Sequence, residues 1–370
     1  MKFELIPWPA QRKIPVPSWR PPSDIRVISA DDHNMEAEHL WEDRLPLEFK
    51  DRAPRHWRDK DGFWQMQVKD RSLVVPGVNQ EISEGCEGFV DRTARLRGMD
   101  AEGVDASILF HGRLQSLNFL IGTEPDLYRA CIDVYNEWLA EYTAPFKERL
   151  IGVAVLPTFL EPKATRTYLD KIKSLGFKAM QMPSYPKGIR YNSMGMEPLW
   201  EAIEESGIPL SFHVGAILEF SGNGAMGANV SRNMAPFRPL LGQLMFAGVF
   251  ERHPKLNVVF TEGGAGWVPH TLFDMDKIAR YYYTELNPKL EELPSFYWKR
   301  QCYATFMDDL VAIECIDRIG ADNIMWSLDF PHAEGVHGYA GQVAKSIYDA
   351  LGHERAKKVL GGTAARLWGI

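Results

Sequence analysis

Residues Phe237–Gly264 read FRPLLGQLMFAGVFERHPKLNVVFTEGG, and this stretch contains the unit that recurs along the chain. Its first part, Phe237–Pro254, spaces apolar residues at helical intervals and ends in a proline, as expected after a helix stop. After a short polar link comes Val258–Phe260, an apolar run without polar alternation, which is followed by Thr261 and Glu262. Strands that are buried on both faces, as in a parallel sheet covered by helices, have this uninterrupted character.

The same order of apolar run, polar loop and amphipathic segment recurs from one end of the chain to the other. The eight apolar runs are Val27–Ala30, Ala106–Phe110, Leu150–Leu156, Ala179–Met182, Leu210–Phe212, Val258–Phe260, Tyr303–Thr305 and Ile324–Ser327. Eight strands that alternate with helices close most naturally into a barrel, so we predict an α/β fold of the (β/α)8 TIM-barrel class. An open doubly wound sheet is the alternative, but no GxGxxG follows a predicted strand.

The barrel is predicted to span residues 25–370, after an N-terminal arm of residues 1–24 that is rich in proline and tryptophan. About seventy residues separate the first apolar run from the second, far more than a normal connection. We predict that residues 34–85 form a lid inserted after the first strand, with a hairpin at Phe63–Gly77. A glycine-rich loop, Phe220–Ser231, follows the fifth strand on the same face of the barrel.

Composition narrows the class of protein. The chain has 370 residues and a net charge of −7, and no Lys/Arg cluster follows a helix face, which argues against a nucleic-acid partner. No apolar run approaches the roughly 20 residues of a membrane span, and the N-terminus lacks the apolar core of a signal peptide. Cys86, Cys131, Cys302 and Cys315 are scattered without a CxxC pair, so we expect reduced thiols and a cytoplasmic protein.

Acidic and histidine side chains follow four of the predicted strands where each strand ends. Asp31 and His33 follow the first strand, His213 the fifth, Glu262 the sixth and Asp329 the eighth. In a barrel these strand ends converge on one mouth, and residues two apart on extended backbone point to the same face. Each residue alone could be a cap, a core histidine or a turn residue, but their coincidence at four strand ends favours a metal site. A mixed nitrogen and oxygen set suits zinc, manganese or iron(II), bound as one ion or as two.

Three further residues are candidates for the same mouth. His332 follows Asp329 by three residues, and we predict that it binds the metal or donates a hydrogen bond to a ligand. His111 ends the second strand and, like Glu36, is a candidate for a second ion or for substrate.

The motifs ISADDHNMEAEHLW, FHVG, VVFTEGGAGWVPH, MWSLDFPHAEG and VLGGTAARLWGI resemble, in this order, those of the amidohydrolase-related family. By that resemblance Asp31, His33, His213 and Asp329 occupy the positions of metal ligands, and Asp329 also accepts the proton of a metal-bound water. Many relatives have histidine or glutamate in place of Asp31, and a substrate-polarising histidine in place of Glu262. A carboxylate cannot donate a hydrogen bond unless it is protonated, so Glu262 would bind the metal, bridge to a second ion or hold a histidine ligand.

The resemblance implies a metal-dependent hydrolase or nonoxidative decarboxylase of a small organic acid, amide or lactone, with Asp329 and Glu262 as its catalytic residues. The alternative is an O2-dependent hydroxylase with a dinuclear iron-containing centre on the same barrel, acting on a small amino acid such as 2-aminoisobutyrate, because carboxylate-rich ligand sets suit iron. A second alternative is a non-catalytic structural subunit. We expect a small-molecule substrate and a homo- or hetero-oligomer with related barrels.

Overall fold

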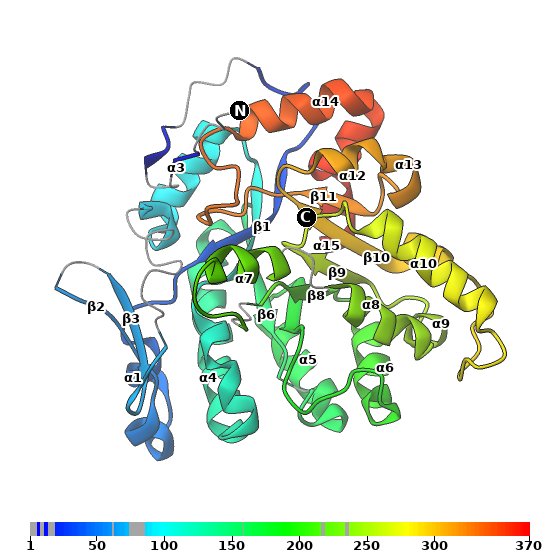
Figure 1. Ribbon diagram of the computed structural model, residues 1–370. Helices are drawn as coiled ribbons and strands as arrows, with labels where there is room; N and C mark the ends of the chain where they lie inside the picture. The colour runs from blue at the N-terminus through cyan, green and yellow to red at the C-terminus, as the bar shows by residue number, and fades with distance from the viewer. Residues whose placement is uncertain are drawn as a thin grey trace.

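The computed structural model describes residues 6–7, 11–13, 19–60, 63–73, 86–157, 159–215, 219–233 and 237–370. Parallel strands form a central barrel, and helices surround it (Figure 1). In their order around the barrel the strands are β1 (Ile28–Asn34), β5 (Ala106–His111), β6 (Leu150–Val155), β7 (Ala179–Pro183), β8 (Leu210–His213), β9 (Val258–Thr261), β10 (Cys302–Phe306) and β11 (Ile324–Trp326). The predicted (β/α)8 class is therefore confirmed.

Helices follow the strands as the sequence pattern predicts. The α-helices are α1 (Leu40–Arg44), α3 (Arg92–Glu102), α4 (Pro125–Thr143), α5 (Thr165–Ser174), α6 (Glu197–Ser206), α7 (Ala225–Asn233), α8 (Phe237–Phe246), α9 (Val249–Arg252), α10 (Val268–Tyr281), α11 (Pro294–Gln301), α12 (Leu310–Glu314), α13 (Ile316–Ile319), α14 (Ala340–Lys357) and α15 (Thr363–Trp368). The 3-10 helices are η2 (Leu47–Arg52), η3 (Glu87–Phe89), η4 (Leu114–Gly122), η5 (Ala144–Phe146), η6 (Pro162–Ala164) and η7 (Met194–Met196), and a π-helical turn, η8, covers Lys358–Gly362. None of the helices in the described part of the chain has the length and apolarity that a bilayer crossing requires.

The first strand is longer than the sequence predicts. The apolar run Val27–Ala30 continues as strand to Asn34, and the pairing of β1 with β5 shifts register after Ser29. Asp31 and His33 therefore lie within β1 and not beyond its end, because the polar residues 32–34 continue to pair with β5.

The barrel closes between β1 and the chain that follows β11. The backbone N–H of Asp329 donates to the carbonyl of Asp31 (2.9 Å), and that of His33 donates to the carbonyl of Phe330 (2.8 Å). These bonds satisfy backbone groups at the edges of both segments. They also bring two sets of predicted metal ligands side by side.

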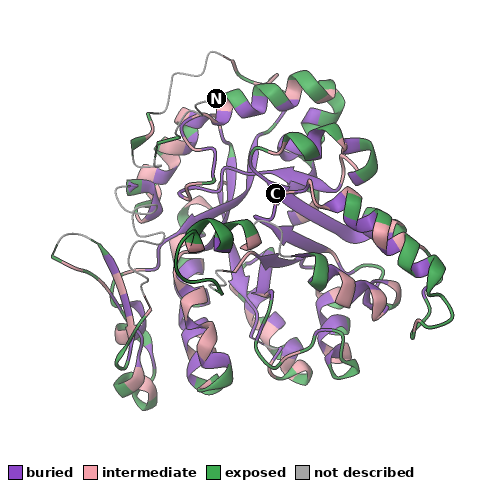
Figure 2. Cartoon of the chain, in the orientation of Figure 1, coloured by how far each residue is buried: buried purple, intermediate pink, exposed green. Residues whose placement is uncertain are grey.

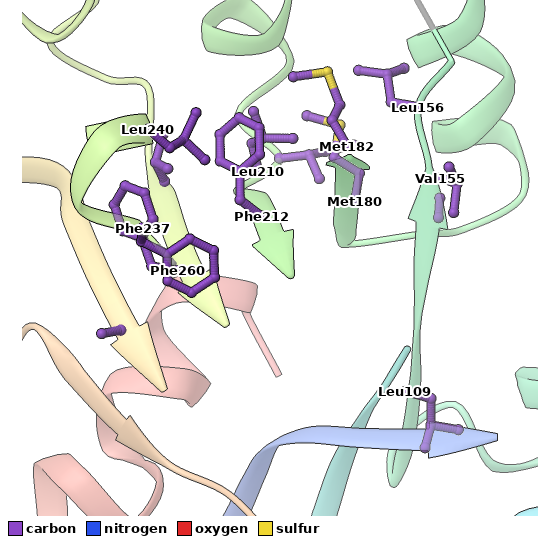
Figure 3. Close-up of a cluster of buried hydrophobic side chains, with 14 of the residues drawn as sticks. Leu109, Val155, Leu156, Met180, Met182, Leu210, Phe212, Phe237, Leu240 and Phe260 are labelled. Atoms are coloured by element: carbon purple, nitrogen blue, oxygen red, sulfur yellow. The ribbon is translucent and has the colours of Figure 1, made fainter. Parts of the chain in front are cut away.

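The apolar core has an inner and an outer part. Ile28, Ile108 and Val259 belong to a cluster that fills the barrel, whereas a larger cluster packs between the strands and the surrounding helices. Figure 3 shows part of the outer cluster, in which Phe237 of α8 packs on Phe260 of β9 with ring centroids 5.3 Å apart. The barrel strands are buried along almost their whole length, and the surrounding helices expose their outer faces (Figure 2).

The insertion after β1 forms a small antiparallel sheet of β2 (Arg55–Arg58), β3 (Trp64–Val68) and β4 (Arg71–Ser72). Strands β3 and β4 form a hairpin within the predicted segment, whose residues 74–77 lie outside the described residues. The sheet and α1 lie beside α4 (Figure 1), where the indole N–H of Trp41 donates to the carbonyl of Cys131 (3.1 Å). Residues 61–62 and 74–85 of the predicted lid are also outside the described residues, so closure of the mouth by this segment stays a prediction.

Two other predicted segments have more structure than a loop or a free arm. The expected glycine-rich loop contains α7, which begins at Ala225, and the Asn229 side chain bonds to the backbone of Phe220 on both its amide atoms (3.0 Å each). In the predicted arm, Arg12 donates to the carbonyls of Gly335 (2.7 Å) and Ala333 (2.6 Å), beyond β11. Residues 1–5, 8–10 and 14–18 of the arm lie outside the described residues.

Candidate metal centre

The structure brings two ligand candidates of β1 together with the last residue of β8. Asp31, His33 and His213 are buried, with exposed fractions of 0%, 1% and 6%. Oδ1 of Asp31 lies 3.8 Å from Nε2 of His33 and 3.4 Å from Nε2 of His213. These distances agree with the prediction that the three side chains converge on one mouth of the barrel.

Both histidines present the same nitrogen to the cluster. Nδ1 of His33 lies 2.7 Å from the carbonyl of His111, and Nδ1 of His213 lies 2.8 Å from the carbonyl of Val214. Because a carbonyl only accepts, these contacts place a ring proton on Nδ1 of each histidine and make Nε2 the nitrogen that can bind an ion. Metal-binding histidines are fixed by such backbone partners.

Glu262 and Asp329 complete the cluster from the segments that follow β9 and β11. Both have left-handed backbones, with φ of 73° and 52°, which non-glycine residues seldom adopt. The Glu262 backbone is held by a hydrogen bond from its N–H to the hydroxyl of Thr305 (2.8 Å). Such strain persists where the surroundings enforce it, commonly at functional sites. Here it turns both carboxylates into the mouth.

His332 joins these two carboxylates. Its Nδ1 lies 2.9 Å from Oδ1 of Asp329 and 3.1 Å from Oε1 of Glu262. Glu262 also reaches His213, whose Nδ1 is 3.2 Å from Oε2. The glutamate therefore links two histidines, which agrees with the expectation that it holds a histidine ligand.

Burial shifts the pKa of every group in this cluster, and neighbouring charges modify each shift. Burial raises the pKa of Asp31 to about 6 and the pKa of Asp329 to about 7. Burial also lowers the pKa of His33 to about 3. It opposes the charged forms of His213 and Glu262 as well, but their attraction outweighs it and brings the pKa of His213 to about 9 and that of Glu262 to about 2. Protons thus balance the carboxylates, and a divalent ion would displace those on the groups that bind it.

The chemistry of the donor atoms fits a divalent metal. Both carboxylate oxygens of Asp31, Nε2 of His33, Nε2 of His213 and Oδ2 of Asp329 are buried without a hydrogen-bond partner. Leaving such atoms unpaired is costly unless a ligand satisfies them. Two groups have ligand atoms within 4.8 Å of one another, namely Asp31, His33, His213 with Glu262, and His33, Glu262, Asp329 with His332. Nitrogen and carboxylate oxygen donors suit zinc, manganese or iron.

Glu36 and His111 belong to neither group. The Glu36 carboxylate accepts three backbone N–H bonds, from Gly112 (3.1 Å), Arg113 (2.8 Å) and Leu114 (3.1 Å), and so holds the turn after β5. These bonds give Glu36 a structural role in place of the predicted ligand role. His111 lies beside the cluster, with its ring centroid 6.2 Å from that of His213.

An ion pair behind the ligands has no counterpart among the sequence-based predictions. Asp32 accepts the N–H of Phe330 (2.9 Å) and the hydroxyl of Ser107, and its Oδ2 lies 4.0 Å from a guanidinium nitrogen of Arg95. Arg95 in turn donates to the carbonyl of His33. Asp32 and Arg95 thus brace both ligand-bearing segments, and we call them the Asp32–Arg95 pair.

A family model described as Amidohydrolase matches residues 88–370. The chain belongs to the amidohydrolase family. It is 26% identical over 329 residues to the gamma-resorcylate decarboxylase of a Rhizobium species, covering 81% of this chain and 93% of that protein. An amidohydrolase of Mycobacterium avium subsp. paratuberculosis has a similar structure, with a TM-score of 0.73 at 19% identity, covering 93% of this chain and 99% of that one.

A third relative is a 5-carboxyvanillate decarboxylase of Novosphingobium aromaticivorans, solved with manganese and 4-hydroxy-3-methoxy-5-nitrobenzoic acid. It has a TM-score of 0.68 at 20% identity and covers 94% of this chain and 96% of that one. Structural similarity at this identity shows the shared fold. The comparisons confirm the predicted class, a metal-dependent hydrolase or decarboxylase of this family, and do not favour the oxygenase or the non-catalytic subunit.

Asp31 and His33 lie before the residues that the family model matches. Their assignment as ligands therefore depends on the geometry of β1. The distances to His213 and the unpaired Nε2 of His33 support it.

Proposed function

We propose that this protein is a metal-dependent nonoxidative decarboxylase of an aromatic acid that carries a hydroxyl group. The gamma-resorcylate decarboxylase, to which it is similar over 81% of its length, supports this choice over hydrolysis. We further propose manganese or zinc as the ion. The nitrogen and oxygen donors of the cluster suit both, and the carboxyvanillate decarboxylase of similar fold was solved with manganese.

The observation that carries the proposal is the state of Asp329. Its carboxyl group is buried, its pKa is raised to about 7 chiefly by that burial, and its Oδ2 has no partner. A carboxyl group with a pKa near neutrality can hold a proton and release it at the same pH. Asp329 is therefore suited to deliver a proton to a substrate at the mouth.

The chain's own residues then account for the proton balance. The bond between the ring carbon and the carboxylate breaks, its electron pair stays on the ring carbon, and carbon dioxide leaves. Asp329 gives its proton to that carbon, and a new C–H bond forms. His332, 2.9 Å from Oδ1 of Asp329, orients the carboxyl group and stabilises the carboxylate that remains.

Asp31, His33 and His213 would hold the ion, and Glu262 would position His213 and His332. When bound, a divalent ion supplies positive charge that binds and polarises the oxygens of an acidic substrate. Glu262 replaces a hydrogen-bond donor found in many relatives, so we assign the polarising role to the ion and not to this residue.

The test is product analysis with protein loaded with manganese or zinc. We expect carbon dioxide and the matching phenol from at least one hydroxybenzoic acid, and loss of both in Asp329→Asn with metal content retained. Hydrolysis of amides or lactones without release of carbon dioxide from any aromatic acid would refute the proposal.

Two further features of the protein are proposals. We propose an oligomer of this chain, alone or with related barrels, because Phe273, Tyr281 and Tyr282 on and after α10 are 59%, 75% and 58% exposed. Light scattering would test it, and a monomer would contradict it. We also propose a cytoplasmic location, supported by four free cysteines, which fractionation of cells would test.

A further inference from the structure

A small recess opens beside His213, over the ends of β5 to β8. It has a volume of about 40 Å³ and is lined by residues that include His111, Gln181, Ser184 and His213. His213 belongs to both regions, because it lines the recess while its Nε2 lies 3.4 Å from Asp31. The recess is therefore adjacent to the ligand cluster but lined by different side chains.

Two buried polar groups of the recess have no partner. Gln181 is 3% exposed and its Nε2 makes no hydrogen bond, and His111 is 7% exposed with an unpaired Nδ1. Neither group belongs to the ligand cluster. Buried polar side chains are nearly always paired, so unpaired groups in a cavity indicate that something else satisfies them.

The side chains that line the recess indicate the charge of the group that would pair with Gln181 and His111. No Lys, Arg, Asp or Glu is among the described residues that line the recess. A neutral imidazole such as that of His111 has one donor and one acceptor nitrogen, and the Gln181 amide likewise offers both. An ammonium group would be buried here without an opposite charge, and a carboxylate would find no lysine or arginine and would compete with Asp31 for His213, so burying either charge is unfavourable.

The volume of the recess limits the size of the group that can enter it. A water molecule needs about 10–15 Å³ of such space, so 40 Å³ admits a hydroxyl group or a similarly small substituent but not an aromatic ring.

We propose that the recess is a subsite that binds a small neutral hydrogen-bonding substituent of the substrate, with a phenolic hydroxyl as the best match, through Gln181 and His111. The inference rests on the proposed function for its choice of an aromatic acid. The carboxylate of the substrate then lies toward the ion, and the hydroxyl group enters the recess on the far side of His213. Gln181 and His111 decide which ring substituents are accepted.

The test measures the binding of benzoate and of its 2-, 3- and 4-hydroxy derivatives to manganese-loaded protein by calorimetry, together with carbon dioxide release from each. We expect at least one hydroxy derivative to bind about tenfold or more tightly than benzoate, since a buried donor is left unpaired without it. In Gln181→Leu that preference should fall to within about twofold, while the affinity for benzoate stays unchanged. Gln181→Met serves instead if the leucine variant does not fold.

The matched control is Ser211→Ala. Ser211 pairs with Gln181 across β7 and β8 and also has a buried, unpaired hydroxyl, but it does not line the recess. We expect this variant to keep the wild-type preference. An equal loss in both variants would mean that the barrel interior, and not the recess, sets the preference.

The outcomes separate the two proposals. If the wild type shows no hydroxyl preference, binds none of the four compounds, or keeps its preference in the Gln181 variants, the subsite proposal is wrong, and water is the partner of both side chains. A preference lost in the Gln181 variants, with no carbon dioxide released from any compound, would uphold the subsite and refute the decarboxylase. Carbon dioxide release, with the hydroxyl preference unchanged in the Gln181 variants, would uphold the decarboxylase and refute the subsite.

Discussion

Replacing Asp32 with asparagine tests whether the Asp32–Arg95 pair braces the metal centre. Asparagine keeps the shape of the side chain but removes its charge. Arg95 is 3% exposed, so its guanidinium group would stay buried without an opposite charge. The amide would also direct a donor at groups that themselves donate, namely the N–H of Phe330 or the hydroxyl of Ser107.

The expected loss of stability follows from these contacts. Removing one partner of a buried ion pair costs about 3–5 kcal/mol. Burial raises the pKa of Asp32 in spite of Arg95, so desolvation already offsets part of their attraction. We therefore expect the lower value, a loss of about 3 kcal/mol in the free energy of unfolding.

Urea unfolding of the metal-free protein measures this loss, with Asp100→Asn as a control. Asp100 pairs with Arg149 at 2.8 Å, but the two side chains are 65% and 32% exposed, so the control should lose no more than about 1 kcal/mol. The metal affinity of Asp32→Asn should also fall, because its side chain holds segments that carry ligands on both sides. A variant within about 1 kcal/mol of wild type, with unchanged metal affinity, would refute the bracing role.

Four other predictions concern the cluster and Glu36 beside it. His213→Ala should lose the metal without unfolding, checked by metal analysis and circular dichroism; full occupancy would remove His213 from the ligand set. Glu262→Gln should lower activity strongly, and metal content where a second ion binds; wild-type activity and metal content would make Glu262 structural. Glu36→Gln should cost about 2 kcal/mol of stability because it weakens charge-assisted bonds to backbone N–H groups, and should leave metal content intact, whereas metal loss would restore its predicted ligand role. Metal affinity should fall as pH drops from about 9 to 5, because His213 holds a proton below about pH 9 and Asp31 below about pH 6, and the ion must displace both; titration calorimetry at several pH values tests this, and a flat profile would contradict it.

The barrel could be predicted from the sequence because each buried strand is an uninterrupted apolar run. The convergence of His213, Glu262 and Asp329 followed from topology alone, since the ends of parallel strands meet at one mouth. The two-residue spacing of Asp31 and His33 was also informative, although the strand that carries them extends beyond its apolar part.

Other parts of the site depend on contacts between residues far apart in the chain. Arg95 lies on α3, 62 residues beyond His33, and no local pattern marks it as a buried partner of Asp32. The same limit applies to Glu36, whose charge suggested a ligand but whose oxygens bind the backbone after β5. Helix α7 lies in a stretch whose glycines favour a loop, and Asn229 holds it there through the backbone of Phe220.

The most direct test of the metal centre is a crystal structure of protein purified without chelators, with anomalous data collected at the manganese and zinc edges. The account predicts an anomalous peak within bonding distance of Nε2 of His33, Nε2 of His213 and a carboxylate oxygen of Asp31. An active protein without a peak at this position, or with its metal bound elsewhere, would contradict it.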